Sequence, residues 1–393
     1  MTSSSTRAAS SAPWRSATPR NSHQARNLRS GAGGFRDTKS HRNRLGGNWI
    51  MTRMEAGTGA EARLSAGAEP VRVTRSGPAP ILVTGAPRSG STWVGNVLAL
   101  DPRSAYIHEP FNKDCPDGRC RARFSGAFTY VTRENEEPYL APLADTLAWK
   151  YSPAAELRRL REPVSRRRPL SRDLARLVRD YSYFETMRRR GQRVILKDPL
   201  AIFSADWIAE RFDARVVVVI RHPAAFIASL RAAGWQRVRF GIFSGQPRLM
   251  EDRLAPYRAA VAAAEAEMPD GVSAGALLWN LVHHHIALLR EEHPDWIFVR
   301  HEDLSRAPES GFREIFTRLG LDFSEDVRSG LARFTSGGAA LSKRSIFGTA
   351  RRTMRNSRDS IALFRERLTP EELARIRDET GPLWQKFYSD ADW

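Results

Sequence analysis

The sequence predicts an α/β domain in which a mostly parallel central sheet is flanked by helices. Two apolar, β-branched runs, at residues 81–83 and 216–220, are typical of strands that are covered on both faces. After each run the apolar residues change to helical spacing, over 92–100 and 223–230. Strands that alternate with helices in this way favour parallel pairing through right-handed crossovers.

The composition indicates one folded region preceded by a basic arm. The chain has 393 residues, 41% of them hydrophobic, which is ample for one large α/β core or two smaller ones. Residues 1–76 are rich in Ser, Ala, Gly and Arg and lack a periodic apolar face. We therefore expect a disordered arm over 1–76 and a folded domain over 77–393. Met51 and Met54 leave open a natural start downstream of Met1.

Positive charge is concentrated in two places. The net charge is +18, and residues 1–76 carry 13 Lys and Arg against 4 Asp and Glu. Residues 158–193 add 13 arginines against 4 acidic residues. Such a surplus favours anionic ligands or surfaces. The arginine runs are either solvated faces or attractors of an anionic acceptor. Nucleic-acid binding is a rival hypothesis that we do not favour, because the arm lacks interleaved aromatic residues.

The sequence contains no secretory signal of the usual kind and no apolar run near the ~20 residues that a membrane span needs. We therefore expect a cytoplasmic protein in which Cys115 and Cys120 remain free thiols. A zinc site would need about two further ligands at suitable spacing, so no metal is expected. The sequence does not indicate an oligomeric state.

The turn after the first predicted strand has the length of a phosphate-binding loop. Gly85 and Gly90 bracket four residues, and a helix follows. Such a loop directs backbone N–H groups toward one point, and the helix N-terminus adds positive partial charge there. A triphosphate-binding loop would have lysine after the second glycine, but Ser91 stands there and Arg88 is the only cation. The loop therefore fits a smaller, less charged anion, or it is an ordinary βα turn without a ligand.

Polar residues lie at the ends of two other predicted strands. His108 and Glu109 come after the strand at 104–107, and Lys197 ends the strand at 193–197. In a parallel sheet these carboxyl ends meet at one edge, where α/β proteins place chemistry. The alternatives are a capped loop for His108 and Glu109, and pairing of Lys197 with Asp198 or solvent.

A second anion site is predicted after the strand at 216–220. Arg221 ends the strand, and Pro223 fits the first turn of a helix that carries Ser229. A guanidinium fork and a hydroxyl placed in this way can converge on one anion.

Both motifs resemble those of a known family. The stretch from Gly85 to Trp93 resembles the 5′-phosphosulfate loop of sulfotransferases that use 3′-phosphoadenosine 5′-phosphosulfate (PAPS). The strand–Arg-x-Pro–helix segment with Ser229 resembles their 3′-phosphate motif. The resemblance implies a P-loop NTPase-like sulfotransferase fold over 77–393, and nucleotide contacts from Pro87, Arg88, Ser89, Gly90, Ser91, Thr92, Trp93, Arg221 and Ser229.

The same resemblance implies transfer of a sulfuryl group from PAPS to a hydroxyl. Arg88 and Lys197 would stabilise developing charge, and Glu109 would act as general base with His108 as its reserve. Arginine at position 88 is typical of carbohydrate and protein-tyrosine members, so we expect a carbohydrate or glycoconjugate acceptor, with lipid-linked and small molecules as alternatives. The rival activity is that of a P-loop-type kinase acting on a nucleotide or small molecule.

Three later segments complete the expectations. The resemblance implies that a basic loop holding Arg352 and Asn356 closes over the nucleotide; the alternative is a solvated loop. The stretch 299–304 resembles a family segment of structural role, with His301 replacing a tyrosine. Apolar residues between Leu174 and Met187 predict an amphipathic helix with arginines on its outer face.

Overall fold

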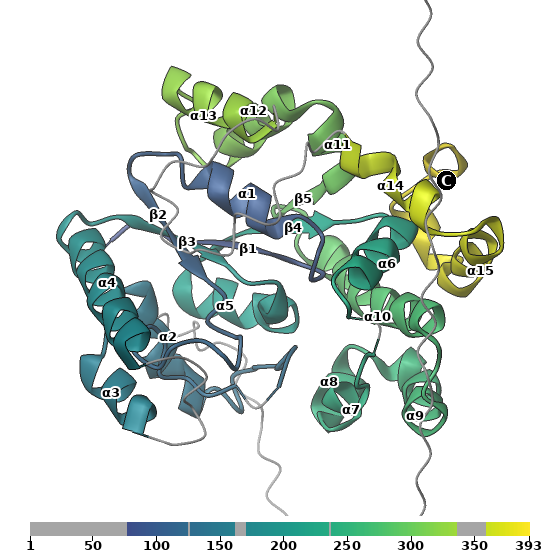
Figure 1. Ribbon diagram of the computed structural model, residues 1–393, viewed down its shortest axis with the longest axis horizontal. Helices are drawn as coiled ribbons and strands as arrows, with labels where there is room; N and C mark the ends of the chain where they lie inside the picture. Colours follow the sequence, from purple (N-terminus) through teal and green to yellow (C-terminus); the bar gives the residue numbers. More distant parts are fainter. Residues whose placement is uncertain (1–76, 125, 162–169, 236, 336–358) are drawn as a thin grey trace, which may run out of the picture. The chain divides into compact units, whose positions relative to one another are not determined.

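The fold is built on a five-stranded parallel sheet with the strand order β2-β3-β1-β4-β5. The computed structural model describes residues 77–124, 126–161, 170–235, 237–335 and 359–393 (Figure 1). Each predicted strand is present, which confirms the predicted α/β class. The strands are β1 (Ile81–Gly85), β2 (Ser104–His108), β3 (Arg193–Lys197), β4 (Arg215–Ile220) and β5 (Ile297–Arg300).

Helices connect the strands and cover both faces of the sheet (Figure 1). In the described residues they are α1 (Ser91–Leu98), α2 (Glu137–Leu147), α3 (Pro153–Arg161), α4 (Leu170–Arg189), α5 (Ala205–Phe212), α6 (Pro223–Ala232), α7 (Gly241–Ser244), α8 (Pro247–Asp252), α9 (Arg258–Glu267), α10 (Gly271–Glu292), α11 (His301–Arg306), α12 (Pro308–Arg318), α13 (Glu325–Thr335), α14 (Asp359–Arg367) and α15 (Pro370–Thr380).

Alternate residues of the central strands feed two separate cores. Val217 and Val219 of β4 pack with α1, α12 and α13 on one face of the sheet. Val216 and Val218 pack with α5, α6 and α10 on the other. Because both faces of the sheet are covered, β4 has apolar β-branched residues at successive positions, where a half-exposed strand would alternate apolar and polar residues.

The strand register brings the predicted chemical residues to one edge. Val83 of β1 lies beside Lys197 of β3, and His108 of β2 lies on the other side of that lysine. Across β1, Gly85 pairs with Val219, and Ile220 of β4 pairs with Arg300 of β5. The loops that leave the carboxyl ends of these strands therefore meet, as the sequence predicts.

The helix predicted between Leu174 and Met187 is present as α4, and its arginines are mostly exposed as predicted, but the predicted apolar face is only partly the buried one. Helix α4 buries Asp173, Asp180 and Phe184, while Leu174 and Val178 are exposed. The buried carboxylate of Asp180 lies 2.7 Å from the guanidinium of Arg119, so the charge is compensated inside the protein. Ion pairing, which hydrophobic periodicity does not detect, decides which face of α4 is buried.

The sequence predicts no apolar run long enough to span a membrane, but helix α10 has that length and composition. By length and composition alone, this 22-residue helix would be able to cross a bilayer, and 72% of its most apolar window is buried inside the protein. It packs against α6 and α15.

Four buried histidines predict a loss of stability in acid. Burial lowers the pKa values of His222, His283, His285 and His301 to about 3. Between that value and the ordinary histidine pKa of about 6.5, the unfolded chain binds more protons than the folded chain. Stability therefore falls as the pH drops below about 6.5, by at most about 1.4 kcal/mol per pH unit for each group. Urea unfolding between pH 7 and pH 5 measures this, and a midpoint independent of pH would contradict it.

Candidate active site

The turn between β1 and α1 depends on both of its glycines. Gly85 has a φ of 132°, and a side chain there would collide with the carbonyl of Val219 on β4. Gly90 has a φ of 101°, and a side chain there would collide with the imidazole of His301. Other residues rarely adopt these backbone angles, so glycine is required at both positions. The result is a tight turn held against β4 and α11, with the first N–H groups of α1 facing its interior.

The two predicted anion motifs are in direct contact. Arg88 is half-buried in the turn, and its Nε donates to the Oγ of Ser229 on α6 at 3.2 Å. The guanidinium of Arg221 donates to the backbone carbonyl of Arg88. The end of β4 and the start of α6 therefore hold the turn that follows β1.

A buried acid that the sequence analysis did not single out supports this junction. Glu302 on α11 accepts from the backbone N–H of His222 at 3.1 Å and from the hydroxyl of Tyr388 at 2.9 Å. Burial raises the pKa of Glu302, and Arg221 opposes that shift. Burial lowers the pKa of Arg221, and Glu302 opposes that shift in turn. The structural role expected for 299–304 is therefore to brace the end of β4.

Unsatisfied donors lie around the turn. The Oγ of Ser89, the Nε of Arg221 and the indole nitrogen of Trp93 are buried and have no hydrogen-bond partner among the described residues. Buried polar atoms of this kind are rare in folded proteins. All three can donate, so together with the α1 N-terminus they suit a ligand rich in acceptor oxygens.

A second group of predicted residues lies at the ends of β2 and β3. The ammonium of Lys197 forms an ion pair with Oε1 of Glu109. The other carboxylate oxygen accepts from Asn112 Nδ2 at 3.1 Å, and it lies 3.8 Å from Nε2 of His108. Glu109, and not Asp198, is therefore the partner of Lys197.

The charges in this group follow from burial and pairing. Burial raises the pKa of Glu109, but the Coulomb attraction of Lys197 and the hydrogen bonds from Lys197 and Asn112 outweigh it, so the pKa lies below its usual value. Burial lowers the pKa of His108 to about 4, so its imidazole is neutral at physiological pH. Burial and Glu109 together raise the pKa of Asp198 to about 7. The carboxylate of Glu109 is thus ionised at neutral pH and is able to accept a proton.

Backbone strain occurs at two of the four candidate catalytic positions. Arg88 has a φ of 70° and Glu109 has a φ of 44°. Left-handed backbone at residues other than glycine costs of order 1–3 kcal/mol and clusters at functional sites. Nothing in the sequence signals this conformation. Arg352 and Asn356, the two remaining predicted nucleotide contacts, lie outside the described residues.

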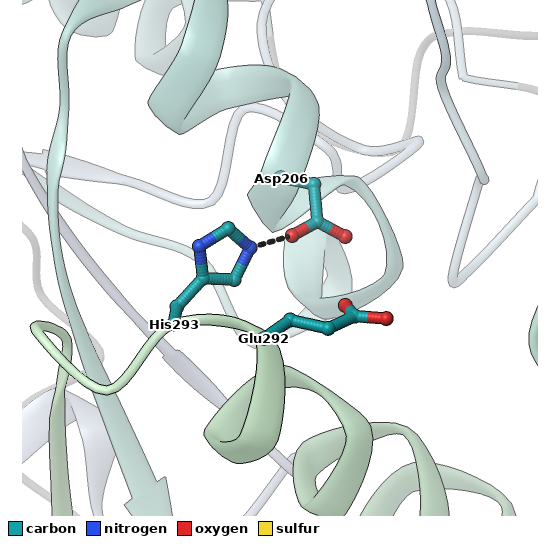
Figure 2. A group of neighbouring side chains, drawn as sticks. All are labelled: Asp206, Glu292 and His293. Atoms are coloured by element: carbon teal, nitrogen blue, oxygen red, sulfur yellow. Dashed lines mark hydrogen bonds and ion pairs between the residues drawn. The ribbon is translucent and has the colours of Figure 1, made fainter.

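One further group of side chains has the composition of a metal site. Asp206 on α5 and His293 point toward each other, with Nε2 and Oδ1 2.6 Å apart, and Glu292 ends α10 nearby (Figure 2). Arg253 already contacts both carboxylates, at 3.0 Å from Asp206 and 2.6 Å from Glu292. The guanidinium supplies the positive charge that a metal ion would bring, so we assign these residues to ion pairing between α5 and α10.

Comparison with known proteins agrees with the motifs. The family model described as "Sulfotransferase family" matches residues 80–325. The chain is similar to the sulfotransferase domain of the Synechococcus PCC 7002 olefin synthase, at 18% identity over 81% of this chain and 98% of that one, with a TM-score of 0.45. A mouse sulfotransferase complexed with PAP matches at 13% identity over 82% of this chain and 89% of that one, with a TM-score of 0.36.

No curated protein matches the chain. The family match spans more than half of the sequence and includes both anion motifs, Glu109 and Lys197. A P-loop kinase is not favoured, because the lysine that such a loop needs after its second glycine is replaced by Ser91. The chain belongs to the sulfotransferase family and has the α/β sulfotransferase fold.

Proposed function

We propose that this sulfotransferase takes its sulfuryl group from PAPS and transfers it to a hydroxyl of a carbohydrate or glycoconjugate. The observation that carries the proposal is the contact between the two anion motifs, in which Arg88 bonds Ser229 and Arg221 bonds the Arg88 carbonyl. A nucleotide with phosphate groups at both its 3′ and 5′ positions needs two such sites at close range. The buried donors of Ser89 and Arg221 supply hydrogen bonds for its oxygens.

In the proposed reaction, the acceptor oxygen attacks sulfur in line with the departing phosphate oxygen. The new O–S bond forms as the S–O bond to the 5′-phosphate breaks, which releases adenosine 3′,5′-bisphosphate. The acceptor proton passes to the carboxylate of Glu109. Arg88 and Lys197 stabilise the negative charge on the bridging and sulfuryl oxygens. As in phosphoryl transfer, positioning and charge stabilisation supply most of the rate.

The cation of the loop limits the routes by which the acceptor hydroxyl can lose its proton. Arg88 presents a planar fork of donors where a lysine would present a point charge. Because a guanidinium stays protonated at all accessible pH values, Arg88 acts through its charge and hydrogen bonds and not as a proton donor. The acceptor proton must therefore leave through Glu109 or, failing that, His108.

The proposed 3′-phosphate site predicts a defined loss of affinity. Ser229→Ala removes a hydroxyl beside a charged ligand, which should weaken binding of adenosine 3′,5′-bisphosphate by about tenfold. Ser310→Ala, at an exposed serine of α12, is the matched control and should leave affinity unchanged. Calorimetric titration measures both variants. Tighter binding of ATP–Mg²⁺ than of the bisphosphate by the unaltered protein would contradict the donor assignment.

The proposed role of Arg88 predicts that its replacement by alanine lowers the reaction rate. Arg88→Ala removes the positive charge next to the sulfuryl group and should lower kcat/KM for PAPS by roughly 10²–10³. Arg88→Lys keeps a charge in the loop and should retain more activity than the alanine variant. The melting temperature of each variant reports whether the turn survives. A fully active alanine variant would exclude a role for Arg88 in the reaction.

If Glu109 is the general base, its substitution should lower kcat and leave the affinity for the nucleotide nearly unchanged. Glu109→Gln keeps the shape and the bond from Asn112 but removes the proton acceptor, so kcat should fall by roughly 10²–10⁴. Affinity for the bisphosphate should stay within about twofold, because the base contacts the acceptor and not the nucleotide. His108→Gln serves as the comparison. If kcat falls only in the His108 variant, the base is the histidine.

A further inference from the structure

Exposed apolar side chains are concentrated on one part of the molecule. Among the described residues, seven large hydrophobic side chains are exposed, and five of them belong to α3 and α4. The five are Leu157, Leu170, Leu174, Val178 and Tyr181. The other two, Trp235 and Met268, are isolated on other segments of the chain. Scattered apolar residues need no explanation, but a concentration of this kind marks an interaction surface.

The residues on α4 form a continuous row. Leu170, Leu174, Val178 and Tyr181 are spaced by four, four and three positions, which places them on one side of the helix. We call these four residues the α4 row. Val178 at its centre is 62% exposed. The row is roughly 16 Å long at the helical rise of 1.5 Å per residue. It lies beside the buried face of α4, which carries Asp173, Asp180 and Phe184.

The charges on α3 and α4 are distributed unevenly between interior and surface. Glu156 is fully buried and accepts from Arg159 and Arg176, each at 2.7 Å. Asp180 is buried against Arg119. Glu156 and Asp180 are thus both buried and paired with arginines inside the protein.

Arginines, in contrast, remain on the surface. Arg158, Arg161 and Arg172 are exposed and make no ion pair with any described residue. Glu185, which is partly exposed, is shared between Arg188 and Arg189 at the C-terminal end of the row. The apolar row therefore lies within a surface of net positive charge.

We propose that the outer surface of α3 and α4 docks this enzyme on an anionic lipid bilayer, with the α4 row entering the interface and the arginines contacting lipid phosphates. A helix that presents apolar side chains between basic ones binds membranes in this way, through buried apolar area together with attraction to anionic headgroups. Tyr181 has the amphipathic character that favours the interfacial region.

The charge pattern argues against three other occupants of this surface: a second copy of this chain, the basic arm and a protein partner. A two-fold contact between copies of this chain would bring the arginine-rich surfaces of α3 and α4 against each other. The basic arm over residues 1–76, with 13 Lys and Arg against 4 acidic residues, is repelled by the same charges. A protein partner would need an acidic groove matched to this convex row, whereas a fluid interface adapts to it.

The test uses the full chain and sedimentation with lipid vesicles. The unaltered protein should bind vesicles of phosphatidylcholine and phosphatidylserine, and bind those of phosphatidylcholine alone much more weakly. The double variant Leu174→Asp/Val178→Asp should reduce binding to the anionic vesicles by about tenfold or more. Both positions are exposed, so the melting temperature and the sulfotransferase activity in solution should stay near those of the unaltered protein.

The matched control separates the row from general charge and from the basic arm. Trp235→Asp/Met268→Asp adds the same two charges at exposed apolar positions elsewhere, and should change vesicle binding by no more than about twofold. Equal binding by both double variants would overturn the proposal, since the arm would then account for the attraction. Absence of vesicle binding by the unaltered protein, or a dimer in light scattering that only the α4 variant disrupts, would also overturn it.

Discussion

The arrangement of the site depends on Arg221, a charged residue at the end of β4 whose Nε is shielded from solvent. Burying a guanidinium is costly unless hydrogen bonds and an opposite charge compensate it. Here the carbonyl of Arg88 accepts one of its N–H groups, and Glu302 opposes the effect of burial on its pKa. The backbone carbonyl of Arg221 in turn accepts from the indole of Trp279 at 2.9 Å. Arg221 thus links the end of β4 to the turn after β1 through its side chain and to α10 through its backbone carbonyl, while Glu302 on α11 opposes the cost of burying its charge.

The central sheet was predictable because its residues respond to a single requirement, burial on both faces. Val216 to Ile220 are apolar and β-branched throughout, so the strand is evident without knowledge of its neighbours. The buried face of helix α4 was only partly predicted because two requirements compete there. Its inner face is determined by the pairing of Asp180 with Arg119, a residue far away in the sequence, and periodicity carries no information about such a partner.

The site was predictable at the level of residue types and not at the level of contacts. Lys197 and Glu109 each follow a strand, and parallel strands bring such residues to one edge. That Lys197 pairs with Glu109 instead of its neighbour Asp198 depends on the backbone, because Asp198 turns inward and accepts the N–H groups of Phe111 and Leu200 at 2.6 and 2.9 Å. The contacts of Glu302 and Tyr388 with the end of β4 were not predicted, because both residues lie far from β4 in the sequence.

The strained backbone at Arg88 and Glu109 gives both groups a fixed position. Each strained residue is held by the end of a neighbouring strand: the carbonyl of Arg88 accepts from Arg221, and the N–H of Glu109 donates to the carbonyl of Lys197 at 2.9 Å. Strain persists only where the surrounding structure enforces it. In the proposed transfer reaction, which needs positioning and charge stabilisation more than covalent assistance from the protein, a cation and a base held in this way would lower the reorganisation that accompanies reaction. Under the proposed mechanism, the sheet edge would therefore contribute to the chemistry through its rigidity as well as through the residues that it carries.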